Sequence, residues 1–362
     1  MAKRKRNSNT LTAQKLGQHG MKIILGLIAT GSFAIAFGEE QIQKIVSGNG
    51  SNQNCLEQFY HEAPPYLNKE SLKKDSYALC FNGFNVMYSG VSKTPLWVAE
   101  YLSPERLNTK IPREDNFHEE MRVAKEHRAT LQDYRGSGSD RGHMAPNADM
   151  STKAAQYDSF SLANMVPQAP KNNQQVWREL EEATRAVVTK HQQDVYVVTG
   201  PVYKGKTLKT IGNGVIIPTA VYKAVYMPKS GVIGAYYAPN DNSQQVHVVS
   251  VCYLEEMLGI NLFPQLSEDK KRNTYNLPLN LNQVKVKREI NYLNWDAESQ
   301  CAEDVNSKTL NALKKEFKGE NTTVTVNDDS PSVPENSSEP SLQESIIRHL
   351  LDELFNYLRR LL

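Results

Sequence analysis

Alternating hydrophobic and polar positions mark several strands in the middle of the chain. Residues 77–102 alternate in this way between Gly and Ser turn signals, which predicts a hairpin or two strands. Residues 194–203 form a more continuous apolar run that leads into Gly-Pro, as expected of a buried strand. Three further apolar runs follow within 220–254. Because short turns join them, we expect these strands to pair antiparallel.

One long segment shows helical periodicity instead. Within residues 172–191 the side chains of Val176, Leu180 and Val187 are spaced to share one face of an amphipathic helix. Residues 103–139, which precede it, are charged and irregular, as in a long loop that carries function or is disordered. Together these patterns predict an α+β fold in which helices flank a mixed, mainly antiparallel β-sheet core.

The N-terminus has the features of an export signal. Residues 1–22 carry six Lys or Arg and no acidic residue, and an apolar run, 23–38, follows them. This run is short for a full membrane span and suits a signal peptide. We expect 1–38 to be a cleaved signal peptide or a retained membrane anchor, with a buried core helix as a third alternative. Signal and anchor both place the body outside the cytoplasm: periplasmic, secreted, or anchored in the inner membrane facing outward.

Composition indicates where the folded domain and its linkers begin and end. Residues 39–54 are polar and rich in Gly, Asn and Ser, which predicts a linker before a folded domain at 55–318. Residues 319–340 are acidic and rich in Ser and Pro, typical of a disordered linker. Residues 341–362 predict a separate amphipathic helix. It could form a homo-oligomer, dock on a partner or a membrane surface, or fold back onto its own domain; its charges favour an oligomer or a protein partner.

Charge and cysteine content narrow the function classes. The net charge is +2, and residues 23–318 nearly balance acids against bases, which argues against a basic protein that packages DNA. The four cysteines lack metal-ligand spacing. In an oxidising compartment their even number indicates two disulfides, and the modest loops favour Cys55–Cys80 with Cys252–Cys301. Four buried thiols are the alternative.

Two neighbouring segments concentrate residues with catalytic chemistry. The first is RGSGSDRGHMAPNADM, 135–150, in which Arg141 stands two positions before His143. A permanent cation so close to an imidazole lowers its proton affinity, so the pair costs stability unless an anion lies between them. The second segment is FSLANMVPQAPKNNQQVWRELE, 160–181. Taken alone, a histidine of this kind is as often a hydrogen-bonded structural residue.

Together the segments resemble the non-specific DNA/RNA endonucleases of the ββα-metal superfamily, which contains secreted bacterial nucleases and mitochondrial endonuclease G. In that family Asp-Arg-Gly-His is followed by Asn-x-x-Pro-Gln and then by an Asn-Gln…Trp…Leu-Glu helix. The corresponding strings here are DRGH (140–143), NMVPQ (164–168), NQQVW (173–177) and LE (180–181). The similarity runs from about Cys55 to about Leu281. It implies a ββα-metal finger active site within the α+β fold.

The resemblance implies a role for each matching residue. His143 corresponds to the general base, Asn173 to the protein ligand of the catalytic metal, and Glu181 to the carboxylate that holds the metal's water shell. The implied metal is Mg²⁺, with Mn²⁺ as an alternative. On a helix, residues eight positions apart lie on nearly the same face, as this metal pair requires. Without the resemblance, Asn173 would be taken for a helix N-cap and Glu181 for part of a solvated face.

Arginines and a further asparagine complete the implied site. Arg141 resembles the phosphate-contacting arginine, and its charge would also keep the neighbouring imidazole neutral and able to accept a proton. Arg113 resembles a second, upstream arginine, with Arg122 and Arg128 as rivals. Asn164 matches an asparagine that supports the site.

We therefore expect a magnesium-dependent endonuclease that cuts both DNA and RNA and leaves 5′-phosphate ends. The sequence contains no helix-turn-helix, zinc-finger or RNP-like string, which fits sequence-blind contacts to the nucleic-acid backbone. The alternative is a non-catalytic component for nucleic-acid binding or uptake, outside the cytoplasm, that docks a partner through 341–362. Such a component would bind nucleic acid without cutting it.

Overall fold

The computed structural model describes residues 54–318. Its centre is a seven-stranded sheet in the order β12-β11-β10-β7-β4-β3-β2, with every neighbouring pair antiparallel. The predicted α+β fold with a mainly antiparallel core is confirmed. The strands of this sheet are β2 (Ser76–Phe81), β3 (Phe84–Ser89), β4 (Thr94–Leu102), β7 (Val195–Val202), β10 (Ala220–Met227), β11 (Val232–Pro239) and β12 (His247–Val249).

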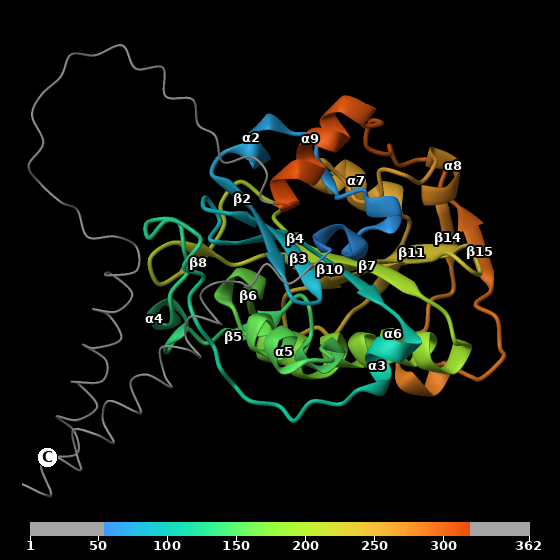
Figure 1. Cartoon of the computed structure of the whole chain (residues 1–362), viewed down its shortest axis with the longest axis horizontal. Helices are drawn as coiled ribbons and strands as arrows, with labels where there is room; N and C mark the ends of the chain where they lie inside the picture. Colours follow the sequence, from blue (N-terminus) through green and yellow to red (C-terminus); the bar gives the residue numbers. More distant parts are fainter. Residues whose placement is uncertain (1–53, 319–362) are drawn as a thin grey trace, which may run out of the picture. The chain divides into compact units, whose positions relative to one another are not determined.

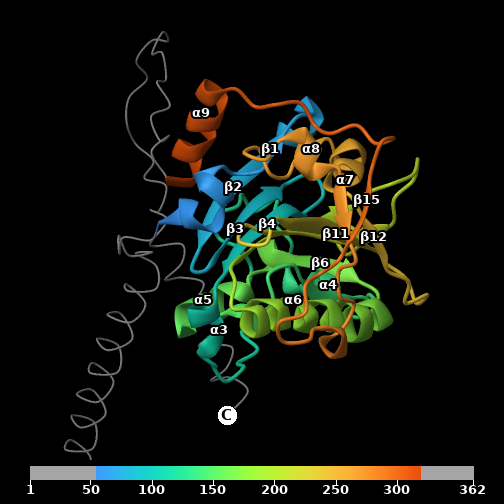
Figure 2. The same cartoon turned by 90° about the vertical axis from the view of Figure 1, so that its right-hand side faces the viewer.

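Helices cover both faces of this sheet (Figure 1). One face carries α3 (Pro104–Asn108), α5 (Lys153–Ser159) and α6 (Arg178–His191), and the other carries α7 (Val251–Leu258), α8 (Glu268–Lys271) and α9 (Ser307–Lys318), as the turned view in Figure 2 also shows. Neighbouring residues of one strand therefore enter different cores: Val98 packs on the α6 side and Trp97 on the α9 side. Burial on both faces explains the continuous apolar runs of the central strands.

Shorter elements connect these layers. Two further single-turn helices are α2 (Glu70–Lys73) and α4 (Leu131–Tyr134), and the 3-10 turns are η1 (Cys55–Gln58), η2 (Tyr60–Glu62), η3 (Asn147–Asp149), η4 (Leu162–Asn164) and η6 (Leu281–Gln283). Three small strand pairs are β1 (Tyr66–Leu67) with β13 (Ile260–Asn261), β8 (Thr210–Ile211) with β9 (Val215–Ile216), and β14 (Asn273–Tyr275) with β15 (Tyr292–Trp295). Between residues 54 and 318 no helix is both long and apolar enough to cross a membrane.

The structure corrects two strand predictions. Residues 77–102 hold three strands, because the chain turns at Gly83, with a φ of +90°, from β2 into β3 before β4 begins. The last of the three strands predicted within 220–254 ends early, at Val249, because Ser250 caps α7: its hydroxyl accepts a hydrogen bond from the Tyr253 N–H at 2.9 Å. The buried strand expected at 194–203 is confirmed by β7.

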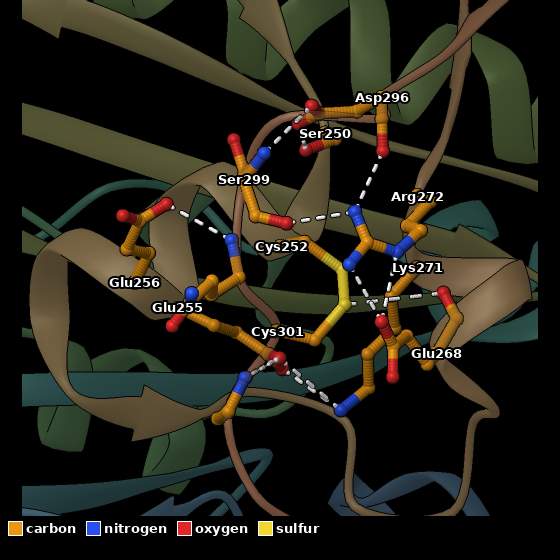
Figure 3. The surroundings of a disulfide bond; sticks show 12 residues. Ser250, Cys252, Glu255, Glu256, Glu268, Lys271, Arg272, Asp296, Ser299 and Cys301 are labelled. Atoms are coloured by element: carbon orange, nitrogen blue, oxygen red, sulfur yellow. Dashed lines mark hydrogen bonds and ion pairs between the residues drawn. A yellow bond between two sulfur atoms is a disulfide. The ribbon is translucent and has the colours of Figure 1, made fainter.

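Both predicted disulfides, Cys55–Cys80 and Cys252–Cys301, are present, so the alternative of four thiols is wrong. The second joins α7 to the segment that leads to α9 (Figure 3). Beside it the Glu255 carboxylate pairs with Lys271 Nζ at 3.0 Å, and both side chains are buried. The chain is therefore cross-linked on the face of the sheet opposite α6.

Four predicted segments lie outside the described residues. They are the signal peptide or anchor (1–38), the linker at 39–54 except for Asn54, the acidic linker (319–340) and the C-terminal helix (341–362).

Candidate active site

The two motif segments fold into one hairpin and the helix that follows it. β5 (Asp140–His143) pairs antiparallel with β6 (Met165–Gln168). The chain then enters a π-helical turn, η5 (Asn172–Trp177), which continues as α6. The predicted helix at 172–191 is thus confirmed, with a wider first turn than expected. This strand-strand-helix order is the one the resemblance implies, on the same side of the sheet as α5 and α6 (Figure 1).

A close approach between the two strands fixes the hairpin. A Cβ on Gly142 would overlap the side chain of Gln168, so glycine is required at this position. Gln168 donates to Asn172 Oδ1 at 2.5 Å, and the Asn172 amide donates to the Pro239 carbonyl at 2.8 Å. The glycine of DRGH therefore lets the hairpin pack against the start of the helix and the end of β11.

His143 lies between two phenylalanines, each of which carries an arginine. Its ring centroid is 5.8 Å from that of Phe117 and 5.1 Å from that of Phe160. The guanidinium carbon of Arg141 is 3.9 Å from the Phe117 centroid, and that of Arg113 is 5.2 Å from the Phe160 centroid. The Nε2 of His143 is buried and has no hydrogen-bond partner in the described part of the chain. Two cations and one unpaired imidazole nitrogen are thus held in one aromatic cluster.

This environment keeps the imidazole neutral. Burial is the largest cause that lowers the pKa of His143 to about 3; the charges of Arg113 and Arg141 act in the same direction, and Asp115 partly opposes them. The expectation that Arg141 lowers this pKa is correct in direction, although burial and Arg113 contribute more. At physiological pH the imidazole is therefore unprotonated, which is the state that a general base needs before the reaction.

Asn173 points its amide nitrogen at the first residue of DRGH. Its Nδ2 donates to Asp140 Oδ2 at 2.8 Å, and Gln174 Nε2 donates to the same oxygen at 2.8 Å. Asn173 lies inside the helix, where its own N–H bonds the Ala169 carbonyl at 2.9 Å, so the N-cap interpretation is wrong. The hydrogen bond to Asp140 orients the amide and leaves its oxygen, Oδ1, for a metal.

Glu181 belongs to a group of charges between α6 and the sheet. Burial raises the pKa of Glu181 to about 7, against the opposing charges of Arg185 and Lys223. Glu181 is half-buried, so it does not belong to a fully solvated helix face. We call the group the charge cluster; its members are Glu100, Arg106, Asp149, Glu181, Arg185 and Lys223.

Asn164 is fully buried and holds the chain just after His143. Its Oδ1 accepts from the Ala145 N–H at 2.8 Å, and its Nδ2 donates to the carbonyls of Ala145 at 2.8 Å and Ser159 at 2.9 Å. Both hydrogen-bonding ends of the amide are therefore used to fix the loop that leaves β5.

The structure separates the three candidate upstream arginines. Arg113 pairs with Asp115 at 2.6 Å, lies over Phe160, and its charge lowers the pKa of His143. Arg122 is paired with Glu120 at 2.7 Å, and Arg128 donates to the Val123 carbonyl at 3.1 Å. Among these three, Arg113 is the one that the fold brings to the aromatic cluster.

Several contacts of the site were not predicted. Asp140 stands within the DRGH string, so its position could have suggested a contact with Asn173, the proposed metal ligand. Phe117 follows Arg113 in the string PREDNF, and only the fold brings it and Phe160 to the imidazole. Asp149 lies in the ADM string, which gave no sign of its ion pair with Arg185.

The donors at this site suit a hard cation. An amide oxygen from Asn173 and a carboxylate from Glu181 are oxygen ligands, which Mg²⁺ prefers, and it binds few protein groups directly. Elsewhere among the described residues, Cys252, Glu255 and Cys301 lie close enough to share a metal, but both sulfurs are in a disulfide. The asparagine and glutamate therefore fit the implied magnesium better than a soft metal.

Comparison with known proteins identifies the family of this chain. The profile of the DNA/RNA non-specific endonuclease family matches residues 64–269. The chain belongs to this family. It is 37% identical over 182 residues to mitochondrial endonuclease G of Homo sapiens, covering 46% of this chain and 59% of the relative. It is 31% identical over 266 residues to the mitochondrial nuclease EXOG of Danio rerio, covering 65% and 77%.

Two further likenesses come from a bacterium and from a solved structure. A nuclease of Nostoc sp. is 33% identical over 214 residues, with 54% of this chain and 76% of the relative covered. A chain from the crystal structure of the EndoG/EndoGI complex aligns at a TM-score of 0.49 and 26% identity, over 54% of this chain and 89% of that chain. The chain spans about three fifths of the length of the human endonuclease G.

Proposed function

We propose that this chain is a magnesium-dependent endonuclease that hydrolyses phosphodiester bonds in DNA and RNA and leaves 5′-phosphate ends. The observation that supports the proposal most strongly is the state of His143. Its Nε2 is buried and has no partner among residues 54–318, Arg113 and Arg141 lie on the two phenylalanines beside it, and burial with these charges lowers its pKa. Membership of the non-specific endonuclease family supports the same chemistry.

In the proposed reaction His143 takes a proton from the attacking water. Arg141 and Arg113 bind the scissile phosphate and offset the negative charge that grows on its oxygens in the transition state. Phe117 lies under the guanidinium of Arg141, and Asp115, which accepts from Arg113 Nε at 2.6 Å, holds Arg113 beside Phe160 before the substrate arrives. The protein thus supplies a base and two prepositioned cations.

The proposed metal site is formed by Asn173, through Oδ1, and by Glu181, through a water. Bound Mg²⁺ supplies a hard positive charge for the phosphoryl and leaving-group oxygens. Asp140 holds the amide of Asn173 in the orientation that presents its oxygen. Mn²⁺ has the same preference for oxygen ligands and is the alternative ion.

We also propose that the protein works in an oxidising compartment, as a periplasmic or secreted protein or as one anchored in the inner membrane facing outward. The two disulfides support this, because such bonds persist outside the reducing cytosol.

The test is cleavage of supercoiled plasmid and of RNA by the full chain, with magnesium or with EDTA, beside the His143→Ala protein. General-base catalysis is worth on the order of 10²–10⁴-fold, so we expect the variant to lose at least that much activity while keeping its fold. Ligation of the products without phosphorylation would show the 5′-phosphate ends. If the wild-type protein retains DNA in a gel shift but cuts it neither with Mg²⁺ nor with Mn²⁺, the proposal is refuted and a binding component is favoured.

A further inference from the structure

Exposed apolar side chains gather on one segment near the end of the described chain. Ten large hydrophobic side chains are exposed among residues 54–318, and five of them lie within 281–295: Leu281, Val286, Tyr292, Leu293 and Trp295. The segment lies outside residues 64–269, which match the family profile, so membership of the family assigns it no role. Exposed apolar side chains that cluster in this way mark an interaction surface.

A β-bulge places two aromatic rings of this segment on the same face of the β14–β15 pair. Tyr292 stands opposite Tyr275, and Trp295 stands opposite Asn273. Between these pairs the register shifts, because Leu293 is an extra residue on β15. Opposite residues share a face, and so do residues two apart on one strand. Tyr292 and Trp295 therefore point to the same side, about 7 Å apart along the strands.

Each ring is supported by a neighbour and still open to solvent. The Tyr292 ring meets that of Tyr275 edge-on, with the centroids 5.6 Å apart. The guanidinium carbon of Arg272 lies 5.2 Å from the Trp295 centroid, and its Nη1 donates to two backbone carbonyls at 2.7 Å. Tyr292 is 53% exposed and Trp295 47%. The rings are thus held in place while about half of each side chain remains available for a ligand.

Three cations without partners precede the rings. Lys285, Lys287 and Arg288 are exposed, and within residues 54–318 their side chains form no ion pair or hydrogen bond. They lie on a turn in which the Arg288 N–H donates to the Lys285 carbonyl at 3.2 Å and Lys287 adopts a φ of +60°, which glycine would favour. Glu289 is the one acidic residue of 285–295, so the segment has a net charge of +2. Unpaired charge of this sign suits a polyanion.

The turn is tied to the C-terminal end of α6. Lys190 Nζ donates to the Val284 carbonyl at 3.0 Å, and His191 Nε2 lies 3.0 Å from the Lys285 carbonyl oxygen. Figures 1 and 2 show the orange chain running from this end of α6 to β15. Asn173, the proposed metal ligand, lies 18 residues before His191 on the same helical run, or about 27 Å at 1.5 Å per residue. About eight nucleotides at 3.4 Å each cover that length.

We infer that residues 285–295 form a second contact for the nucleic acid, and that this surface takes single-stranded DNA or RNA. The three cations bind its phosphates, and the two rings stack on its unpaired bases. The inference rests on the proposed function, since it adds an accessory surface to the substrate site of that nuclease. In a duplex the bases already stack on one another, so exposed rings favour a single strand. A second copy of the chain would instead bring the same cations against one another across a two-fold axis.

The first test measures binding of a fluorescent oligothymidylate of about 30 nucleotides to the full chain, by anisotropy in EDTA so that nothing is cut. Trp295→Leu keeps an apolar side chain but removes the ring. Loss of one stacked base corresponds to about 5- to 150-fold in affinity, so we expect at least a 5-fold weaker complex. Trp295→Phe, which keeps an aromatic face, should recover most of the loss. Wild-type affinity in Trp295→Leu, or no recovery in Trp295→Phe, would overturn the inference.

The cations are tested through the salt dependence of the same binding. Each phosphate contact on a single strand contributes about 0.7 to the slope of log K against log salt concentration. The slope should therefore become shallower by about 2 in a triple variant that combines Lys285→Ala, Lys287→Ala and Arg288→Ala. The control removes the same charge from exposed positions of α9, on the opposite face of the sheet, and combines Lys308→Ala, Lys315→Ala and Lys318→Ala. Equal changes in both triple variants would mean a general effect of charge and would overturn the site.

Two further measurements test the alternative ligands. A duplex of about 30 base pairs offers phosphates without free base faces, so Trp295→Leu should bind it like the wild type. An equal loss on duplex and single strand would overturn the assignment to single strands. Light scattering tests for a second copy: a dimer that dissociates in Trp295→Leu while the affinity for oligothymidylate stays unchanged would assign the surface to self-association. If Trp295→Leu does not fold by circular dichroism, the triple variant of the exposed turn decides the matter.

Kinetics in Mg²⁺ separate this inference from the proposed function. Trp295→Leu should raise KM for the oligothymidylate and leave kcat unchanged, because the surface lies away from the reacting phosphate. A fall in kcat with an unchanged KM would overturn an accessory contact. A wild type that binds the oligothymidylate but cuts nothing refutes the proposed function, and the binding comparisons then still decide the inference.

Discussion

The amide of Asn173 donates to Asp140 Oδ2 at 2.8 Å, so the first residue of the DRGH strand holds the proposed metal ligand on the helix. The contact joins β5 to the π-helical turn, and it spans 33 residues of sequence. Because an ionised carboxylate only accepts hydrogen bonds, it binds the NH₂ end of the amide and directs the oxygen end away from itself. The orientation of the ligand is thus set by charge and not by packing.

Asp140→Asn should therefore raise the Mg²⁺ concentration that the protein needs for activity. An asparagine can donate as well as accept, so it no longer selects one orientation of the Asn173 amide. We expect activity at low Mg²⁺ to fall about 10- to 100-fold and to recover in part at high Mg²⁺. A titration of the initial rate against Mg²⁺ measures this. Gln174→Ala is the control, since Gln174 donates to the same oxygen without being a ligand; an unchanged Mg²⁺ curve for Asp140→Asn would contradict the prediction.

Arg113→Ala should change both substrate binding and the acid side of the pH profile. Loss of a charge-assisted phosphate contact costs about 1.5–3 kcal/mol, or about 10- to 100-fold in kcat/KM. The charge of Arg113 lowers the pKa of His143, so without it the imidazole protonates at a higher pH. The acid limb of kcat/KM should move upward in pH. Arg128→Ala, an arginine held by the Val123 carbonyl, should show neither change; equal effects from both variants would count against Arg113.

Asn164→Ala should destabilise the domain. It removes three hydrogen bonds and leaves the Ala145 N–H and two carbonyls buried without a partner. Each unsatisfied group costs about 1–3 kcal/mol, partly relieved by relaxation, so we expect the free energy of unfolding to fall by about 2–4 kcal/mol. Denaturant unfolding with the disulfides intact measures it. A loss below about 1 kcal/mol would mean that water replaces the amide.

The β5–β6 hairpin and the helix after it could be predicted from the sequence because their residues are close together in it. DRGH, NMVPQ and the Asn-Gln…Glu helix lie within 42 residues, 140–181, and the local pattern indicates strand, strand and helix in order. The two disulfides were predictable from the even number of cysteines and from loops of modest length, with separations of 25 and 49 residues. In both cases the paired segments are separated by a small part of the chain.

The rest of the site depends on how distant strands pair. Phe117 and Phe160 reach His143 only through the fold of the long loop, and no periodicity marks them. Glu100 follows an apolar run in LWVAEYL, where an acidic residue would normally mark a solvent-facing position. The sheet is covered on both faces, so this carboxylate is buried instead. Pairing order and register, which place it near Lys223, cannot be obtained from one strand's sequence.

The buried carboxylate of Glu100 predicts a stability that falls as pH rises. Burial is the largest cause that raises its pKa from the ordinary 4.5 to about 8; Asp149 adds to the rise, and Arg106 and Lys223 oppose it. Neither carboxylate oxygen has a hydrogen-bond partner in the described chain. Between pH 4.5 and 8 the unfolded chain has lost this proton while the folded chain keeps it, so folding becomes less favourable with increasing pH.

Glu100→Gln removes that penalty. The difference in melting temperature between variant and wild type should therefore shift in favour of the variant from pH 5 to pH 8.5, as measured by thermal unfolding in matched buffers. Glu120→Gln is the control. Burial alone would raise the Glu120 pKa, but the hydrogen bonds and charge of Arg122 outweigh it and lower that pKa, so its effect on stability changes only below about pH 4.5. For Glu120→Gln, the difference in melting temperature from the wild type should stay constant across pH 5–8.5. If the difference for Glu100→Gln is equally constant, Glu100 is ionised in the folded protein and paired with Arg106.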